Sequence, residues 1–152
     1  MEEPCRIRPA DSADAAALLE LERACFSDPW SEMGLQEVLA TPTTIALVAE
    51  KGLTIAGYAI ARAVVDSAEI LTLGVHPGLQ RQGIASHLLQ DLLGRLSSLG
   101  VTEVWLEVRV SNTAARTLYQ SRQFRITGMR RAYYRLPTED ALLYRLQLPD
   151  DA

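Results

Sequence analysis

Apolar residues recur at helical spacing in four stretches of the chain. The longest stretch, Ile84 to Leu99, repeats leucine at four-residue spacing and predicts an amphipathic helix packed against a sheet. Gly100 follows it directly, as glycine often does where a helix ends. Capping residues precede the other three stretches, which predicts these helices: one through Leu18, Leu21 and Cys25 after Asp11 and Ser12; one with Met33, Leu35, Val38 and Leu39 as its apolar residues, between Ser31 and Thr41; and Thr113 to Arg122 after Asn112.

Runs rich in β-branched and apolar residues predict strands at Arg6 to Arg8, Thr44 to Ala49, Thr54 to Val65, Ala68 to Val75, Val101 to Val108, Phe124 to Met129 and Leu142 to Leu148. The short turns Lys51-Gly52 and Asp66-Ser67 imply antiparallel neighbours. The strand after the long helix should lie parallel to the strand before it. We expect the last two strands to form an antiparallel pair joined by a long loop, Arg130 to Ala141. The predicted fold is α/β, with a mixed, mostly antiparallel sheet, one parallel strand-helix-strand junction and helices on both faces.

The composition predicts one globular domain that spans residues 1–152. Hydrophobic residues make up 48% of the chain and charged residues 22%, which is sufficient for a single sizeable core. The net charge of -4 is unevenly distributed, because residues 1–76 hold 5 basic and 12 acidic residues and residues 77–152 hold 10 and 7. The arginine-rich second half suits a polyphosphate ligand and the acidic first half a cationic one, although both can be ordinary solvated surface.

Neither the cysteines nor the histidines predict a metal site. Cys5 and Cys25 have no metal-ligand spacing and suggest reduced thiols in a reducing compartment, and His76 and His87 are isolated. The acidic start Met1 to Glu3 and the lack of a long apolar run lead us to expect a cytoplasmic protein with no membrane contact. Few aromatic residues lie between the C-terminal arginines, which argues against direct nucleic-acid binding.

A candidate anion site lies between the strand that ends at Val75 and the long helix. The turn there reads Gln80-Arg81-Gln82-Gly83-Ile84-Ala85, which is neither a nucleotide-hydrolase loop nor a dinucleotide fingerprint. Backbone N–H groups at a helix start are unpaired and the helix dipole adds positive charge, so such a turn suits phosphate. Arg81 could add a formal charge. The alternative is an ordinary strand-to-helix turn with one glycine.

Two residues are candidates for acid–base chemistry. Acyl transfer from a thioester to an amine requires a base for the amine and a proton donor for the departing thiolate. Glu107 lies on the opposite face of its strand from Leu106 and Val108, so it could face a cleft, or it could be a surface carboxylate paired with Arg109. Tyr119 is protonated at neutral pH and could donate a proton, although a helical tyrosine is more often a packed side chain.

These motifs together resemble the GCN5-related N-acetyltransferase (GNAT) family. The anion turn fits the pattern Q/R-x-x-G-x-G/A, with Gln80, Gly83 and Ala85 on the motif positions. The resemblance to the RimI type of this family, which acetylates the N-terminal alanine of a small-subunit ribosomal protein, covers residues 6 to 148 and is dense from Asp66 onward. Besides the turn it rests on Asp28-Pro29-Trp30-Ser31, Val75-His76-Pro77, Leu106-Glu107-Val108-Arg109, Asn112, Ala115, Leu118-Tyr119, Phe124, Arg130-Arg131 and Tyr133-Tyr134.

The resemblance implies an acetyltransferase that uses acetyl-CoA and no metal, acts on a protein N-terminus and is a monomer or weak dimer. It assigns Glu107 as the general base and Tyr119 as the general acid. We expect Arg130, Tyr133 and Tyr134 to bind the acceptor from the long loop. The implied cofactor-binding residues are Leu73, Gly74, Val75, Arg81, Gln82, Gly83, Ile84, Ala85, Ser86 and Asn112.

Two positions depart from the family pattern. Gln123 replaces a usual glycine, which costs about 1 kcal/mol if the position is left-handed. Ala132 stands where RimI-type chains often carry a polar residue, which leaves peptide specificity open. Three hypotheses therefore compete: a RimI-type N-terminal acetyltransferase, a relative that acts on lysine or a small amine, and a CoA-binding module without turnover.

Overall fold

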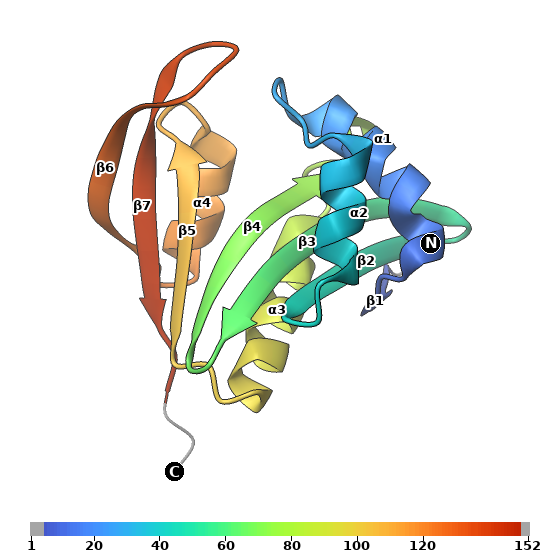
Figure 1. Ribbon diagram of the computed structural model, residues 1–152, viewed down its shortest axis with the longest axis horizontal. Coiled ribbons are helices and arrows are strands. Elements are labelled where there is room, and N and C mark those ends of the chain that lie inside the picture. The colour runs from blue at the N-terminus through green and yellow to red at the C-terminus, as the bar shows by residue number, and fades with distance from the viewer. Residues whose placement is uncertain (1–4, 150–152) are drawn as a thin grey trace.

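The computed structural model describes residues 5–149, so the acidic start Met1 to Glu3 lies outside it. Figure 1 shows a single sheet with helices on both of its faces. The strands of the described residues are β1 (Arg6–Pro9), β2 (Thr44–Lys51), β3 (Thr54–Val64), β4 (Ser67–Val75), β5 (Glu103–Arg109), β6 (Arg125–Tyr134) and β7 (Glu139–Gln147). The helices are α1 (Ala15–Cys25), α2 (Glu32–Ala40), α3 (Ile84–Ser98) and α4 (Thr113–Ser121), with short 3-10 turns at Ser12–Asp14 and Pro77–Leu79.

The seven strands follow the order β1-β2-β3-β4-β5-β7-β6. β4 and β5 pair in parallel and every other neighbouring pair is antiparallel. The predicted mixed sheet with one parallel junction is therefore confirmed. The predicted caps are also confirmed: the Asp11, Ser31 and Asn112 side chains accept backbone hydrogen bonds at helix starts, and Gly100 is left-handed after α3.

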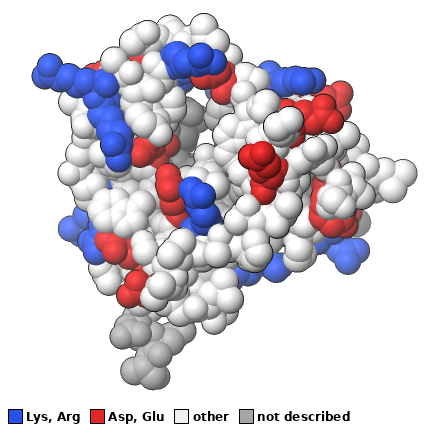
Figure 2. Space-filling view, viewed as in Figure 1, with Lys and Arg blue, Asp and Glu red and all other residues white. Residues whose placement is uncertain are grey.

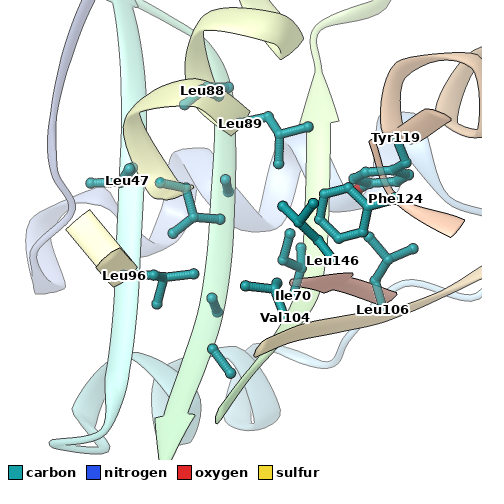
Figure 3. Packing of buried hydrophobic residues seen from close by; sticks show 14 of the residues in the cluster. Leu47, Ile70, Leu88, Leu89, Leu96, Val104, Leu106, Tyr119, Phe124 and Leu146 are labelled. Carbon is teal, nitrogen blue, oxygen red and sulfur yellow. The ribbon is translucent and has the colours of Figure 1, made fainter. Parts of the chain in front are cut away.

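Two hydrophobic clusters hold the helices on the sheet. The larger one joins α3 and α4 to one face, and Figure 3 shows Leu88, Leu89 and Leu96 of α3 in this cluster with Tyr119 of α4. The smaller cluster packs α1 and α2 on the other face over Tyr58 and Ile60. The prediction that Met33 belongs to the apolar side of α2 is wrong, because it is 71% exposed.

The parallel pair β4–β5 separates halfway along its length. Its pairing ends at Ile70 opposite Leu106, and the next residue, Leu71, is the extra residue of a bulge in the β3–β4 pairing. A bulge bends its strand and strengthens the local twist, so β4 turns away from β5 beyond this point. Figure 1 shows the carboxyl ends of the two strands diverging.

The expected long loop from Arg130 to Ala141 is wrong. β6 continues to Tyr134 and β7 begins at Glu139, so only four residues join the two strands. The sequence did not predict this extension because β6 is an edge strand whose residues are almost all exposed, and it carries no alternation of apolar and polar positions. A register shift between Arg130 and Tyr134, with Ala132 at φ 49°, further disrupts the pattern.

Candidate active site

A cavity of about 200 Å³ lies where β4 and β5 diverge. The strand ends form its floor, the segment Phe26 to Trp30 after α1 forms one wall, and α4 with Tyr134 of β6 forms the other. Five of the predicted site residues line it together: Leu73, Glu107, Asn112, Tyr119 and Tyr134. Ligands of open α/β sheets bind beyond the carboxyl ends of parallel strands, which is where this cavity lies.

Glu107 extends from β5 on the face opposite the buried Leu106 and Val108, as its position in the strand predicts. Its side chain is 16% exposed and accepts a hydrogen bond of 3.1 Å from Nε of Arg130. The alternative that pairs it with Arg109 is wrong, because Arg109 pairs with Glu139 instead. Interaction with the Glu107 carboxylate raises the pKa of Tyr133, which lies on β6.

Arg109 holds the turn between β6 and β7. Its guanidinium donates to the carbonyl oxygens of Arg135 (2.6 Å) and Pro137 (2.9 Å) and lies 4.6 Å from the centre of the Tyr134 ring. Cation–π contact and charge-assisted hydrogen bonds of this kind fix one conformation of the turn. Arg109 therefore fixes the position of Tyr134, which forms part of the cavity wall.

Tyr119 is a buried residue of α4 whose side chain reaches the cavity. Its ring packs edge-on against Phe124 at 5.4 Å between centroids and lies 6.4 Å from Tyr144. Burial, followed by the nearby Tyr134, raises the pKa of Tyr119, so its phenol stays protonated at neutral pH. Among the described residues no hydrogen bond involves its hydroxyl, which leaves that group available to a ligand.

The predicted acceptor-binding residues lie on strand β6 and not on a loop. Arg130 contacts Glu107, and Tyr133 is 52% exposed next to Tyr134. Burial, with the charge of Glu107, raises the pKa of Tyr134 to about 12. These side chains are therefore held by strand β6. No loop has to close over the acceptor to bring them to the cavity.

The anion turn lies outside the lining of this cavity, at the start of α3. Arg81 and Gly83 both have positive φ, 66° and 82°, and no side chain caps α3. A Cβ at Gly83 would meet no atom within 4 Å, so the backbone there faces open space. Gln82 accepts a hydrogen bond from Lys51, and Ser86 one from Arg122. The end of β4 links the turn to the cavity, because Gln80 donates to the carbonyl of Val75.

Glu22 is a cavity residue that the sequence did not single out. It is 3% exposed, and its carboxylate accepts from the hydroxyls of Tyr58 (2.5 Å) and Thr72 (2.7 Å) and from the backbone of Trp30 (3.3 Å). These bonds join α1 to β4 just after the bulge and to the wall segment. The available signal was a glutamate four residues after Leu18 on the apolar side of its helix, where a charge is costly unless it has partners.

The cysteines and histidines lie outside the lining of the cavity. Within residues 5–149 no group of three or more His, Cys, Asp or Glu residues is arranged to hold a metal ion. Both cysteines are free, and His76 caps the short turn after β4 through its Nδ1 atom. None of the described helices has both the length and the apolar character that a membrane crossing requires.

The sequence and the fold of this chain are similar to those of known acetyltransferases. The profile of the Acetyltransferase (GNAT) family matches residues 15–124. The N-alpha-acetyltransferase RimI of Mycobacterium tuberculosis is 39% identical over 149 residues, which cover 94% of this chain and 92% of the relative. The [ribosomal protein bS18]-alanine N-acetyltransferase of Escherichia coli K12 is 34% identical over 142 residues, 91% of this chain and 94% of the relative.

The fold agrees with this relationship. The crystal structure of the ribosomal-protein-S18-alanine N-acetyltransferase from Escherichia coli matches with a TM-score of 0.91 and 31% identity, covering 97% of this chain and 96% of that one. Sequence and fold thus agree over nearly the whole chain. The chain belongs to the GNAT acetyltransferase family, among its RimI-type members.

Proposed function

We propose that this protein transfers an acetyl group from acetyl-CoA to the N-terminal α-amine of a protein. The observation that carries the proposal is the cavity between β4 and β5, which both Glu107 and Tyr119 line in a chain that matches RimI-type relatives over about nine-tenths of its length. The RimI relatives are named for α-amine and alanine acetylation, which favours an alanine at the start of a small-subunit ribosomal protein as acceptor.

We infer that acetyl-CoA binds along the end of β4 and the start of α3. The α3 start offers unpaired N–H groups, the positive end of a helix dipole and open space above Gly83, which suits a pyrophosphate. We infer that residues 81–86 hold the pyrophosphate, that Leu73, Gly74 and Val75 hold the adjoining arm along β4, and that Asn112 contacts it from α4. Acetyl-CoA supplies the activated acetyl group as a thioester.

Glu107 and Tyr119 have proposed roles that follow from their surroundings. The Glu107 carboxylate in the cavity takes a proton from the acceptor amine, directly or through a water, and Arg130 holds it in position. Tyr119 keeps its proton because burial raises its pKa, and its hydroxyl can then donate to the departing sulfur. Both groups line one cavity, where the acceptor amine and the thioester of acetyl-CoA have to meet.

An α-amine is the acceptor that a single glutamate can serve most easily. The reference pKa of an α-amine, near 7.7–8.0, leaves a useful fraction of it neutral. A lysine side chain has a reference pKa of about 10.4, so its deprotonation costs roughly 3.4 kcal/mol more than that of an α-amine. We therefore expect faster transfer to the α-amine than to a lysine of the same peptide. The two other hypotheses, a lysine or small-amine acetyltransferase and a CoA-binding module, remain as outcomes of the test.

The test is acetyl-CoA turnover on short peptides that begin with alanine, with the N-terminus either free or blocked. We expect peptides with a basic or aromatic second residue to be acetylated at the α-amine, as shown by mass-spectrometric mapping of the label. A label chiefly on lysine, or an unchanged rate with a blocked N-terminus, would favour the lysine or small-amine hypothesis. CoA binding without turnover on any amine would favour the binding module.

A further inference from the structure

Three carboxylates line the cavity, and they differ in what neutralises them. Glu22 is buried and takes hydrogen bonds from Tyr58, Thr72 and the Trp30 backbone. Glu107 is held by Arg130 and has the proposed role of base. Asp28 differs from both, because its ion-pair partner is Arg135, whose side chain is 75% exposed at the rim. Asp28 is thus the cavity carboxylate whose charge a ligand can most easily reach.

Asp28 and Arg135 join the two walls across the mouth of the cavity. The guanidinium of Arg135 makes two bonds to the carboxylate, Nε to Oδ2 at 2.7 Å and a second nitrogen to Oδ1 at 3.0 Å. This bonding holds the pKa of Asp28 below its usual range. Figure 1 shows the segment after α1 and the β6–β7 turn facing each other, and in Figure 2 acidic and basic side chains meet at the upper rim of the same face.

The Arg135 side chain can leave Asp28 without moving the turn that carries it. Arg109 holds the backbone of the turn by donating to the carbonyls of Arg135 and Pro137. Glu139 fixes the base of the same turn by accepting from the Ser111 backbone at 2.6 Å. Because neither contact uses the Arg135 guanidinium, only the rotation of one exposed side chain separates a closed mouth from an open one.

We propose that Asp28 is a specificity residue that binds a cationic side chain near the N-terminus of the acceptor, and that Arg135 occupies this subsite when no acceptor is bound. This inference rests on the proposed N-terminal acetylation. An acceptor with a guanidinium or ammonium group close behind its first residue replaces Arg135 at Asp28, so one ion pair is exchanged for another. A neutral acceptor gains nothing from Asp28. The exposed pair is weak enough to exchange, since such pairs contribute little to stability.

The test compares alanine-initiated peptides that carry a single arginine at position two, three or four with the same peptides carrying citrulline. Citrulline keeps the shape of arginine without its charge, and neither residue offers a lysine amine. The measured quantity is the ratio of KM for the citrulline peptide to KM for the arginine peptide. In the wild type we expect this preference for arginine to be about three-fold or more at one of the positions and to fall as salt is added.

Two variants and a control assign the preference to the ion pair. Asp28→Asn should bring the ratio close to one. Arg135→Gln keeps the carbonyl that Arg109 holds but removes the competing cation, so the ratio should rise about two- to five-fold. Asp91→Asn, which removes a partly exposed ion pair with Arg95 on α3 outside the cavity lining, should leave the ratio unchanged.

The outcomes separate this inference from the proposed function. Wild-type turnover with no arginine preference at any position, or an arginine preference that Asp28→Asn retains, overturns the assignment of Asp28 while N-terminal acetylation stands. An equal ratio in Arg135→Gln and the wild type overturns the role of Arg135 as a competitor. Absence of α-amine acetylation for every peptide instead overturns the proposed function on which the subsite rests.

Discussion

Tyr119 and Glu107 reach the same cavity but are held in different ways. Tyr119 is buried in the larger hydrophobic cluster, and its ring makes the contacts that keep it there. Glu107 lies on the cavity face of β5 and is held by Arg130 of β6. Conservative substitutions can remove each functional group while most of these contacts remain, which allows a proposed chemical role to be separated from a structural one.

Tyr119→Phe removes only a hydroxyl that is unbonded among the described residues, so we expect turnover to fall by about 10² or more with little change in stability. Tyr144→Phe is the matched control, because its hydroxyl accepts from Gln120 (3.1 Å) and Arg116 (3.3 Å) in the same cluster. That variant should lose about 1 kcal/mol or more of unfolding free energy and keep its turnover. Steady-state kinetics and chemical denaturation of both variants decide the matter; equal turnover in both would remove Tyr119 as the acid.

Glu107→Gln preserves shape and removes basicity, so turnover should fall by about 10² or more while acetyl-CoA binding stays nearly intact. Glu103→Gln is the control on the same face of β5, where Glu103 pairs with Arg145. Kinetics with calorimetric titration of acetyl-CoA measures both effects. A wild-type rate in Glu107→Gln would show that another group takes the proton.

At the residue scale, the sequence predicted the direction of a side chain better than it predicted the residues that the side chain contacts. Glu107 was placed on the correct face because strand parity follows directly from the apolar set. Its partner Arg130 was not predicted, because it comes from β6, a strand whose exposed residues carry no periodic pattern. Gln123 is left-handed at φ 74°, as its replacement of a glycine suggested. Glu22 and Asp28 were missed as functional candidates because their neighbours in space are far away in sequence.

At the element scale, helices and strands were predictable wherever one side is buried. The four α-helices of residues 5–149 and the strands β2 to β5 follow the apolar pattern, since burial on one side imposes a period. The extension of β6 and β7 and the divergence of β4 from β5 were not predictable in this way. The first depends on backbone pairing at an exposed edge, and the second on a single bulge residue, Leu71.

The start of α3 offers a prediction with an internal control. Gly83 and Gly100 both have positive φ, 82° and 87°, and a Cβ at either position would meet no atom within 4 Å. Valine at either position should therefore lower the free energy of unfolding by a similar amount, about 1–2 kcal/mol, because of the backbone conformation alone. Only Gly83→Val puts a side chain in the proposed path of the pyrophosphate, so only it should weaken CoA binding, by about tenfold or more.

Calorimetric titration of CoA into both folded variants measures this difference, and denaturation curves check that their stabilities match. If Gly83→Val binds CoA as tightly as Gly100→Val does, the anion turn has no part in the cofactor site. The paired design matters because a loss of affinity in Gly83→Val alone could otherwise reflect a general loss of stability.

At the scale of the whole molecule, buried tyrosines lie in both hydrophobic clusters. Tyr58 lies under α1 and α2 on one side of the sheet, and Tyr119 lies between α4 and the other side. Burial raises the pKa of both phenols, and Glu22 adds to the effect at Tyr58. Burial also raises the pKa of Tyr134 to about 12. Packing on both faces of the sheet should therefore lose stability at high pH.

The sign of this sensitivity follows from proton counting. In the unfolded chain these tyrosines lose their protons near pH 10, whereas in the folded protein they keep them, so above that pH the unfolded state binds fewer protons and stability falls. Each fully buried tyrosine contributes up to about 1.4 kcal/mol per pH unit above pH 10. Cys25, whose pKa is also raised by burial, adds to the trend from about pH 8.5.

We therefore expect the free energy of unfolding to fall progressively above about pH 10, and Tyr119→Phe to make the decline shallower while leaving stability at pH 8 nearly unchanged. Chemical denaturation at intervals from pH 8 to pH 11.5 measures the slope, and tyrosinate absorbance reports ionisation in the folded and unfolded states. Ionisation of every tyrosine near pH 10 in the folded protein, with no loss of stability, would show that neither cluster excludes the phenolate. A slope that Tyr119→Phe leaves unchanged would assign the sensitivity to the opposite face, where Tyr58 donates its hydrogen bond to Glu22.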